Sequence, residues 1–343
     1  MIWVKAFLGA VVLVVGLSAT SHATDSLQRS WEVFQERHVA ADGRVVDDGN
    51  GGISHSESQG YTLLLAAELD SPGVFARVWT WTRNNLLIRD DGLVAWRYDP
   101  ESEPPITDVN NASDGDLLIA HALSLAARRW QRQDYREEAE QLALAIRSEL
   151  VREVGPYTLL IPGREGFAQE DGLVVNPSYW LFASLEEMQE LDPDPVWQTL
   201  IDSGRQLLRD LIATYPLIPD WVTVEADGSF SPPDELPWES GYNALRVPLY
   251  LLAAGVNEAE VLEAYAVSWG DTGAPFPVVQ PLVGESEVEF NDDPAYDALR
   301  QLLACARQEQ GVGQRSLSPE SFYYPATLLL LSNLYRDRGF PGC

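Results

Sequence analysis

Three polar segments of the chain place carboxylates where an apolar helix is expected to begin. Glu57 lies within residues 54–61, just ahead of a run of apolar side chains. Asp114 and Asp116 open the apolar stretch 114–130. Two carboxyl groups facing one substrate can supply the acid and base that glycoside hydrolysis requires. These segments are therefore candidates for such a pair of carboxylates.

A purely structural interpretation of the same acids has to be weighed. An acidic side chain in the first turn of a helix is stabilised by the helix dipole, which accounts for Glu57 without any chemistry. Ser113 is the expected N-cap of the helix that holds Asp114 and Asp116. Capping explains one of these two aspartates well and the second less well. We therefore expect the aspartates to face an opening between helices.

The third segment, residues 238–246, combines polar side chains with the start of another apolar helix. Asn243 and Arg246 stand where burial is expected, and buried polar groups need partners. Arg246 could pair with Asp114 or with Asp116, as a structural bridge or as part of a catalytic site. The sequence leaves these two roles open.

Aromatic side chains that could bind sugar rings are abundant, with 11 Trp and 13 Tyr in the chain. Flat apolar surfaces suit the C–H faces of sugars, and such residues line many ligand sites. We expect Trp96 and Tyr179 to form sugar platforms, and Trp81 and Trp130 to belong to the core.

The hydrophobic pattern predicts an all-α fold. Some expected helices, such as 114–130 and 242–254, are apolar all round and should be buried, whereas 135–151 has one charged face. This alternation favours an inner and an outer ring over a helical solenoid, and the chain shows no repeat of about 34 or 40 residues. Helices are expected around Leu27, Trp31 and Phe34 and over residues 61–69, 74–87, 114–130, 135–151, 179–191, 196–213, 242–254, 258–268, 294–309 and 319–336.

Four long connections hold most of the unusual residues, and long ordered loops in a compact domain are usually functional. They span residues 88–113, 152–178, 215–241 and 269–290. Within the third, residues 221–230 predict a small hairpin around Asp227-Gly228. We expect these loops to shape a cleft.

The N-terminus predicts export. Lys5, the apolar run 6–17 and the sequence Ser21-His22-Ala23 match a signal peptide over residues 1–23, with an uncleaved anchor as the alternative. Residues 24–343 are expected to form one catalytic domain in the periplasm or outside the cell. No later stretch is long and apolar enough to predict stable insertion in a membrane.

Charge and cysteines narrow the possible partners. The net charge of −29 disfavours binding to nucleic acid and suits a neutral or cationic substrate.

Cys305 and Cys343 could pair in an oxidising compartment or remain free thiols. Two thiols and four scattered histidines make no metal-ligand pattern. We expect no metal, no cofactor and a monomer.

The motifs together resemble glycoside hydrolase family 8, and most of all its bacterial endoglucanases that accompany cellulose synthesis. The run Ala112-Ser113-Asp114-Gly115-Asp116 leading to Trp130 is the most specific match. The other matching stretches are residues 43–45, 56–61, 81–86, 160–163, 176–179, 219–221 and 242–246.

The resemblance implies an (α/α)6 barrel that hydrolyses β-1,4-glucan with inversion. It assigns the general acid to Glu57 and implies that Asp114 orients the sugar at the bond to be cut. Trp96, Tyr179, Asp116, Tyr242 and Arg246 are the expected substrate-binding residues.

One departure concerns the general base. Cellulase members of the family carry an aspartate where this chain has Asn243, and an amide is no useful base near neutral pH. Family branches with asparagine there take the base from the preceding loop, which here offers Asp234, Glu235 and Glu239. We favour Glu239.

Because Asn243 departs from the family pattern, two alternatives to a cellulase stay open. One is a hydrolase of another β-glycan, such as mixed-linkage glucan, xylan or chitosan. A second is a glucan-binding protein without activity. A helical scaffold for protein partners is disfavoured by the polar motifs at the starts of buried helices.

Overall fold

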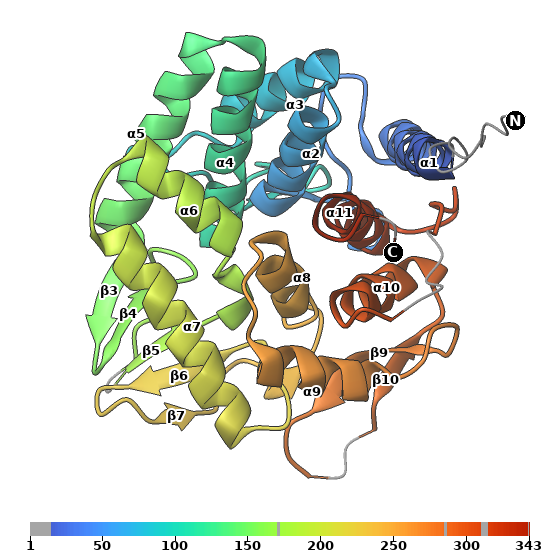
Figure 1. The fold of residues 1–343 in the computed structure, drawn as a ribbon. Coiled ribbons are helices and arrows are strands. Elements are labelled where there is room, and N and C mark those ends of the chain that lie inside the picture. The colour runs from blue at the N-terminus through green and yellow to red at the C-terminus, as the bar shows by residue number, and fades with distance from the viewer. Residues whose placement is uncertain (1–14, 170–171, 285–286, 310–314, 342) are drawn as a thin grey trace, which may run out of the picture.

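The computed structural model describes residues 15–343 apart from 170–171, 285–286, 310–314 and 342 (Figure 1). Its inner helices surround the middle of the molecule, each packed against the next, and their side chains are buried on nearly every side. They are α2 (Ser56–Glu68), α4 (Ser113–Trp130), α6 (Phe182–Leu191), α8 (Arg246–Ala253), α10 (Asp297–Ala306) and α11 (Tyr323–Gly339).

A second set of helices packs outside this ring and completes the double layer (Figure 1). One face of α5 is buried on α4 while its charged face meets solvent, which is the pattern that predicted a surface helix. The outer helices are α1 (Val15–His38), α3 (Pro72–Asn85), α5 (Gln133–Leu150), α7 (Val196–Thr214) and α9 (Ala259–Trp269).

Helices α2 and α4 lie unusually close together because glycines face the contact. A Cβ added to Gly60 would come 2.6 Å from Cβ of Leu118. One added to Gly115 would come 2.7 Å from Cβ of Ser56 and 2.8 Å from the backbone nitrogen of Glu57. No real side chain fits at such distances, so the two backbones touch along the segment that carries the candidate acids.

Except for the two strand residues just before α2, the β-structure lies in or directly beside the predicted long connections. Strands β1 (Ser54–His55) and β2 (Arg97–Tyr98) pair, as do β3 (Val151–Val154) and β4 (Tyr157–Leu160). The predicted hairpin is present as β6 (Val222–Glu225) and β7 (Phe230–Ser231), and β5 (Gly172–Val175) extends its sheet. A last sheet has the order β10 (Glu289–Asn291), β9 (Phe276–Pro281), β8 (Glu239–Ser240).

Several expected helix starts were wrong. Helix α2 begins at Ser56 rather than Tyr61, because His55 caps it through a bond from the backbone N–H of Ser58 to Nδ1. Helix α8 begins at Arg246 rather than Tyr242. Ala112 and not Ser113 is the N-cap of α4, since the carbonyl oxygen of Ala112 accepts the backbone N–H of Asp116 at 3.1 Å.

Helix α6 begins at Phe182 rather than at Tyr179, because Tyr179 belongs to the short 3-10 helix η1 (Pro177–Tyr179) that precedes it. A similar turn, η2 (Pro294–Tyr296), precedes α10.

One hydrophobic cluster runs through the barrel from Leu27 to Leu334. A disulfide joins Cys305 in α10 to Cys343, which decides between the two states that the sequence left open. Within the part of the chain that the structure describes, no helix is long and apolar enough to cross a membrane. Most of the expected signal peptide, residues 1–14, lies outside the described residues.

Candidate active site

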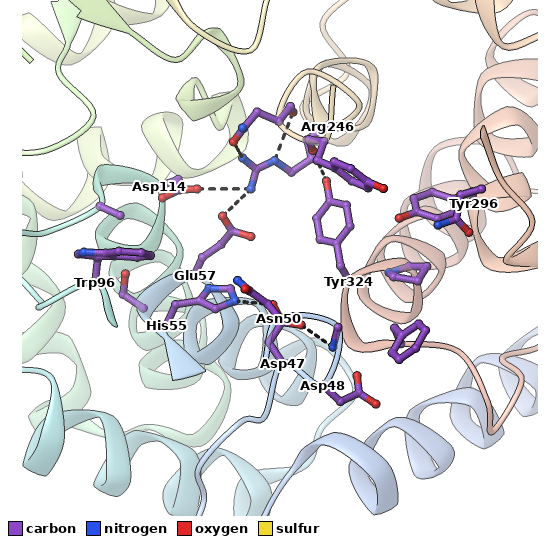
Figure 2. A pocket seen from close by; sticks show the side chains of 18 of the residues that line it. Asp47, Asp48, Asn50, His55, Glu57, Trp96, Asp114, Arg246, Tyr296 and Tyr324 are labelled. Carbon is purple, nitrogen blue, oxygen red and sulfur yellow. Dashed lines mark hydrogen bonds and ion pairs between the residues drawn. The ribbon is translucent and has the colours of Figure 1, made fainter. Parts of the chain in front are cut away.

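A cleft of about 910 Å³ opens above the starts of inner helices. Glu57, Asp114 and Arg246 point toward one another at its floor (Figure 2). Of the residues expected at the site, seven line the cleft: Glu57, Asp114, Asn243, Arg246, Trp96, Tyr179 and Tyr242.

Glu57 is positioned by the way α2 begins. His55 caps the helix, and the backbone N–H of Ser56 donates to the carbonyl oxygen of Trp96 at 2.9 Å. Nε2 of His55 lies 3.2 Å from Oδ2 of Asp47. The start of α2 is thus tied to the turn at residues 47–50 and to the loop that carries Trp96.

Arg246 joins the two candidate acids. Its Nη1 lies 2.6 Å from Oε2 of Glu57 and 3.4 Å from Oδ2 of Asp114. The Arg246 and Asp114 side chains are buried, whereas that of Glu57 keeps 16% of its surface exposed. Of the two partners proposed for Arg246, the structure selects Asp114.

Glu57 and Asp114 also share a hydrogen bond, and their pKa values move in opposite directions. Burial raises the pKa of Glu57, but Arg246 and the bond with Asp114 outweigh burial and lower it to about 2. Burial and the charge of Glu57 raise the pKa of Asp114 well above its ordinary value. Two carboxyl groups this close cannot both ionise easily, so the pair holds one proton, mainly on Asp114.

Asp220 fixes the turn that precedes α8. Its Oδ1 accepts the backbone N–H groups of Gly241 and Ala244, both at 2.8 Å. Its Oδ2 accepts the backbone N–H and the Nδ2 of Asn243, both at 3.3 Å. A Cβ on Gly241 would lie 2.9 Å from Oδ2, so glycine permits this approach. These bonds explain why residues 242–245 form a turn before the helix.

Asp116 does not line the cleft. It is fully buried behind the site, where Oδ1 accepts the N–H of Val94 at 2.9 Å and Oδ2 accepts Nδ2 of Asn111 at 2.8 Å. Burial raises its pKa to about 7. Asp116 therefore supports the segment that leads to Trp96 rather than facing a substrate.

The acids of the loop before α8 also lie outside the cleft lining. The carboxylate of Glu239 lies beside Gly241, with Oε1 about 3.5 Å from where a Cβ of Gly241 would be. Burial, Asp220 and Glu289 raise its pKa. Asp234 and Glu235 are not among the lining residues either.

Aromatic side chains stand on both sides of the acids. Trp96 lies on one side and Tyr296 on the other, with Tyr324 beside Arg246 (Figure 2). Tyr179 packs its ring 5.8 Å from the Arg246 guanidinium, and the hydroxyl of Tyr242 donates to Glu289 at 2.9 Å. Trp81 is buried in the core as expected, whereas Trp130 is only partly buried at its edge.

Sequence reasoning missed a large part of one wall. It comes from the turn at residues 47–50 and from the region around η2 and the start of α11, and it includes Asp47, Asn50, Asp293, Tyr296, Phe322 and Tyr324. The run Phe322-Tyr323-Tyr324 at the start of an apolar helix was the signal that could have located the second part. The turn at 47–50 carried no comparable signal.

The structure offers no obvious cation site in the residues it describes, since no three of their His, Cys, Asp or Glu side chains are grouped to hold a metal ion. The cleft itself presents carboxyl, amide and guanidinium groups from Glu57, Asp114, Asn243 and Arg246.

Comparison with known proteins identifies the family. The model of the glycosyl hydrolases family 8 matches residues 4–338. The chain belongs to glycosyl hydrolase family 8. This confirms the family expected from the sequence.

Family 8 relatives match over nearly the whole chain. A probable endoglucanase of Novacetimonas hansenii is 35% identical over 331 residues, which are 96% of each chain. The solved endo-beta-1,4-glucanase CMCax of Acetobacter xylinum superposes with a TM-score of 0.83 at 34% identity, covering 91% of this chain and 98% of that one. These matches confirm the predicted (α/α)6 barrel.

A second solved structure shows the same likeness. Endoglucanase Cel10 of Klebsiella pneumoniae matches with a TM-score of 0.82 and 31% identity, over 90% of this chain and 99% of its own. The reducing-end-xylose releasing exo-oligoxylanase, at 20% identity and a TM-score of 0.73, shares the family 8 fold alone.

Proposed function

We propose that the chain hydrolyses internal β-1,4-glucosidic bonds of cellulose or a related β-glucan, with inversion at the anomeric carbon. One observation carries the proposal: Glu57 and Asp114 meet on Arg246 at the floor of an open cleft, in a family 8 chain. Relatives similar over almost their whole length are named endoglucanases.

In this proposal Glu57 is the general acid. It is the more exposed of the two acids and lines the cleft, so it can reach a glycosidic oxygen. The proton that the pair holds on Asp114 can pass to Glu57 across their hydrogen bond as the bound sugar draws Glu57 away from Arg246. Asp114 then orients the sugar and stays next to Glu57. No glycosyl-enzyme forms, because inversion takes place in one displacement.

The proposed base is Glu239. An inverting site needs a second carboxylate at about 6.5–9.5 Å from the acid, with room for a water molecule. Asn243 lines the cleft and can orient that water by hydrogen bonds, but it cannot take its proton. Glu239 lies in β8, just before the turn that carries Asn243, and its raised pKa makes it a better proton acceptor. Its carboxylate has to turn past Gly241 to reach the water.

Sugar rings would pack on the aromatic walls. Trp96 and Tyr179 are the proposed platforms, Tyr242 and Arg246 the proposed polar contacts, and Tyr296 a further aromatic surface across the cleft. Asp116 is proposed to act indirectly, by holding the segment before Trp96.

The acidic walls favour one alternative substrate. Asp47, Asp48 and Asp293 line the cleft in addition to the two acids at its floor, whereas Arg246 at the floor is buried among partners. A glycan with amino groups, such as chitosan, would complement these charges.

A panel of glycans tests both possibilities. The chain is incubated with carboxymethyl cellulose, mixed-linkage glucan, xylan and chitosan, and reducing ends are counted. Loss of viscosity at few cuts would indicate endo action, and NMR of early products should show α-anomers released from β-linkages. Tight binding of glucan with no product at any pH would indicate a glucan-binding protein without hydrolase activity. Cleavage of chitosan alone would replace the glucan assignment.

Export, a monomeric state and a role in cellulose synthesis also belong to this proposal. They rest on the signal-like N-terminus and on the likeness to bacterial endoglucanases. Cell fractionation, light scattering and the identity of neighbouring genes would test them separately.

A further inference from the structure

The guanidinium of Arg246 divides its hydrogen bonds between two sides of the cleft floor. Nη1 faces Glu57 and Asp114, at 2.6 and 3.4 Å. Nη2 instead donates to Oδ1 of Asn243 at 2.8 Å and to Oγ of Ser178 at 3.0 Å. The group therefore offers its charge to carboxylates on one side and meets only neutral acceptors on the other.

The side-chain amide of Asn243 is held in one orientation. Its Nδ2 donates to Oδ2 of Asp220, so its oxygen must face Arg246. Asp220 in turn is fixed by three backbone N–H groups of the turn 241–244. An aspartate at position 243 would add a third carboxylate to the same guanidinium and would face Asp220 without a proton to donate.

We propose that Asn243 is a positioning residue, which reserves the charge of Arg246 for the Glu57–Asp114 pair and so sets the pH at which that pair loses its proton. This role rests on the proposed function, in which Glu57 is the general acid. Asparagine rather than aspartate at position 243 therefore affects the protonation of the Glu57–Asp114 pair as well as the identity of the general base.

The tyrosine side chains around Arg246 add no charge to its surroundings. Tyr61 and Tyr250 lie beside it from α2 and α8, Tyr179 from η1 and Tyr324 from α11. Burial raises the pKa of each of these tyrosines, so they stay neutral. His55 faces Glu57 from β1. Two carboxyl groups therefore share one guanidinium, and a third in direct contact would weaken its hold on both.

The test compares two amide-to-carboxylate changes. Asn243→Asp puts a charge on Arg246. Asn291→Asp makes the same change on another residue lining the cleft, in β10, for which the structure gives no bond to Arg246. Carboxyl carbon-13 NMR follows the pair, with signals assigned from Glu57→Gln and Asp114→Asn. For Asn243→Asp we expect the last proton to leave at a pH higher by about one unit or more. For Asn291→Asp we expect less than half that shift.

The alkaline limb of kcat/KM should move in the same direction in Asn243→Asp, because the Glu57–Asp114 pair keeps its proton to higher pH. Asn243→Ala removes the amide without adding charge, so its pair should titrate at or below the wild-type pH. Equal shifts in the two aspartate variants, no shift in Asn243→Asp, or a rise in Asn243→Ala would each overturn the proposal. Asn243→Ala provides this test even if Asn243→Asp does not fold.

The NMR titration needs no turnover. A protein inert on every glycan that shows the expected shift would refute the proposed function while the charge coupling stands. An active enzyme whose pair titrates alike in wild type and Asn243→Asp would do the reverse.

Discussion

Nη1 of Arg246 lies 2.6 Å from Oε2 of Glu57, so the proposed general acid rests in an ion pair. A carboxylate held in this way is a poor proton donor until the contact loosens. Binding of a sugar must therefore supply the energy that separates the two groups. This requirement links substrate binding to the protonation of the acid.

Replacing Glu57 by glutamine should remove most of the turnover and leave glucan binding close to normal. The amide keeps the shape of the side chain and cannot deliver a proton, and general acid catalysis contributes about 10²–10⁴-fold. Initial rates and isothermal calorimetry measure the two quantities. Glu140→Gln on the exposed face of α5 is the control. Turnover within a few-fold of wild type would remove Glu57 from the mechanism.

Glu239→Gln should abolish hydrolysis if this carboxylate takes the proton of the attacking water. Asp234→Asn and Glu235→Gln, in the same loop, should keep activity within a few-fold, because their carboxylates are farther along the chain from Asn243. Reducing-sugar assays compare the activities of the three variants. Their melting temperatures are measured first, to show that each variant is folded like the wild type. Full activity of all three, or loss of activity in Asp293→Asn alone, would place the base elsewhere in the cleft.

Trp96→Ala should weaken binding of long oligosaccharides more than short ones, because a platform contacts only sugars that reach it. Nε1 of Trp96 donates to Asp108 at 2.7 Å, which holds the ring at the rim of the cleft. Affinities for a series of cello-oligosaccharides provide the measurement. Trp130→Ala, away from the cleft, should lower the melting temperature with affinity unchanged. If both variants behave like Trp130→Ala, Trp96 is structural.

Asp116 should make the folded state less stable as pH rises. Its pKa is about 7 in the folded protein, against 3.8 for an ordinary aspartate, so the folded state binds more protons between these pH values. The free energy of unfolding should then fall between about pH 4 and 7, by up to about 4 kcal/mol from this group. Urea unfolding of wild type and Asp116→Asn gives the difference. That difference should change with pH over this interval, and a constant difference would contradict the assignment.

The disulfide should stabilise the barrel without affecting catalysis, because Cys305 and Cys343 lie outside the cleft lining. Its partners are 38 residues apart, and closing such a loop contributes about 2–4 kcal/mol. Cys343→Ser should lower the free energy of unfolding by this amount and leave kcat/KM at the wild-type value. A lower kcat/KM of Cys343→Ser at temperatures where the variant is still folded would show that the C-terminus influences the site.

The fold was largely predictable because the inner helices are apolar all round and the outer ones are not. Helix α4 illustrates this: the stretch 114–130 predicted a buried helix, and the structure has Ser113–Trp130. The starts of α2 and α8 were mispredicted because each depends on a side chain distant from the expected helix: His55 caps α2, and Asp220 binds the turn before α8. Hydrophobic periodicity carries no information about such bonds.

The site was predicted where the residue types are unusual for their position. Two aspartates at the start of an apolar helix, and an arginine in another, pointed to the pair that meets on Arg246. The same reasoning could not separate Asp114, which faces the cleft, from Asp116, which faces Val94. Two residues along a helix differ by about 200° in direction, so only the rotation of α4 in the barrel decides which one reaches the substrate.

The close contact of α2 and α4 at Gly60 and Gly115 has a consequence for how this enzyme can diversify. The segment bearing Glu57 cannot move without pushing on the backbone that bears Asp114. The spacing of the reactive groups is therefore a fixed part of the scaffold, and substitutions in either helix cannot retune it by small steps. New specificities have to arise in the connections that build the walls, where insertions and exchanges leave the spacing of the acids unchanged.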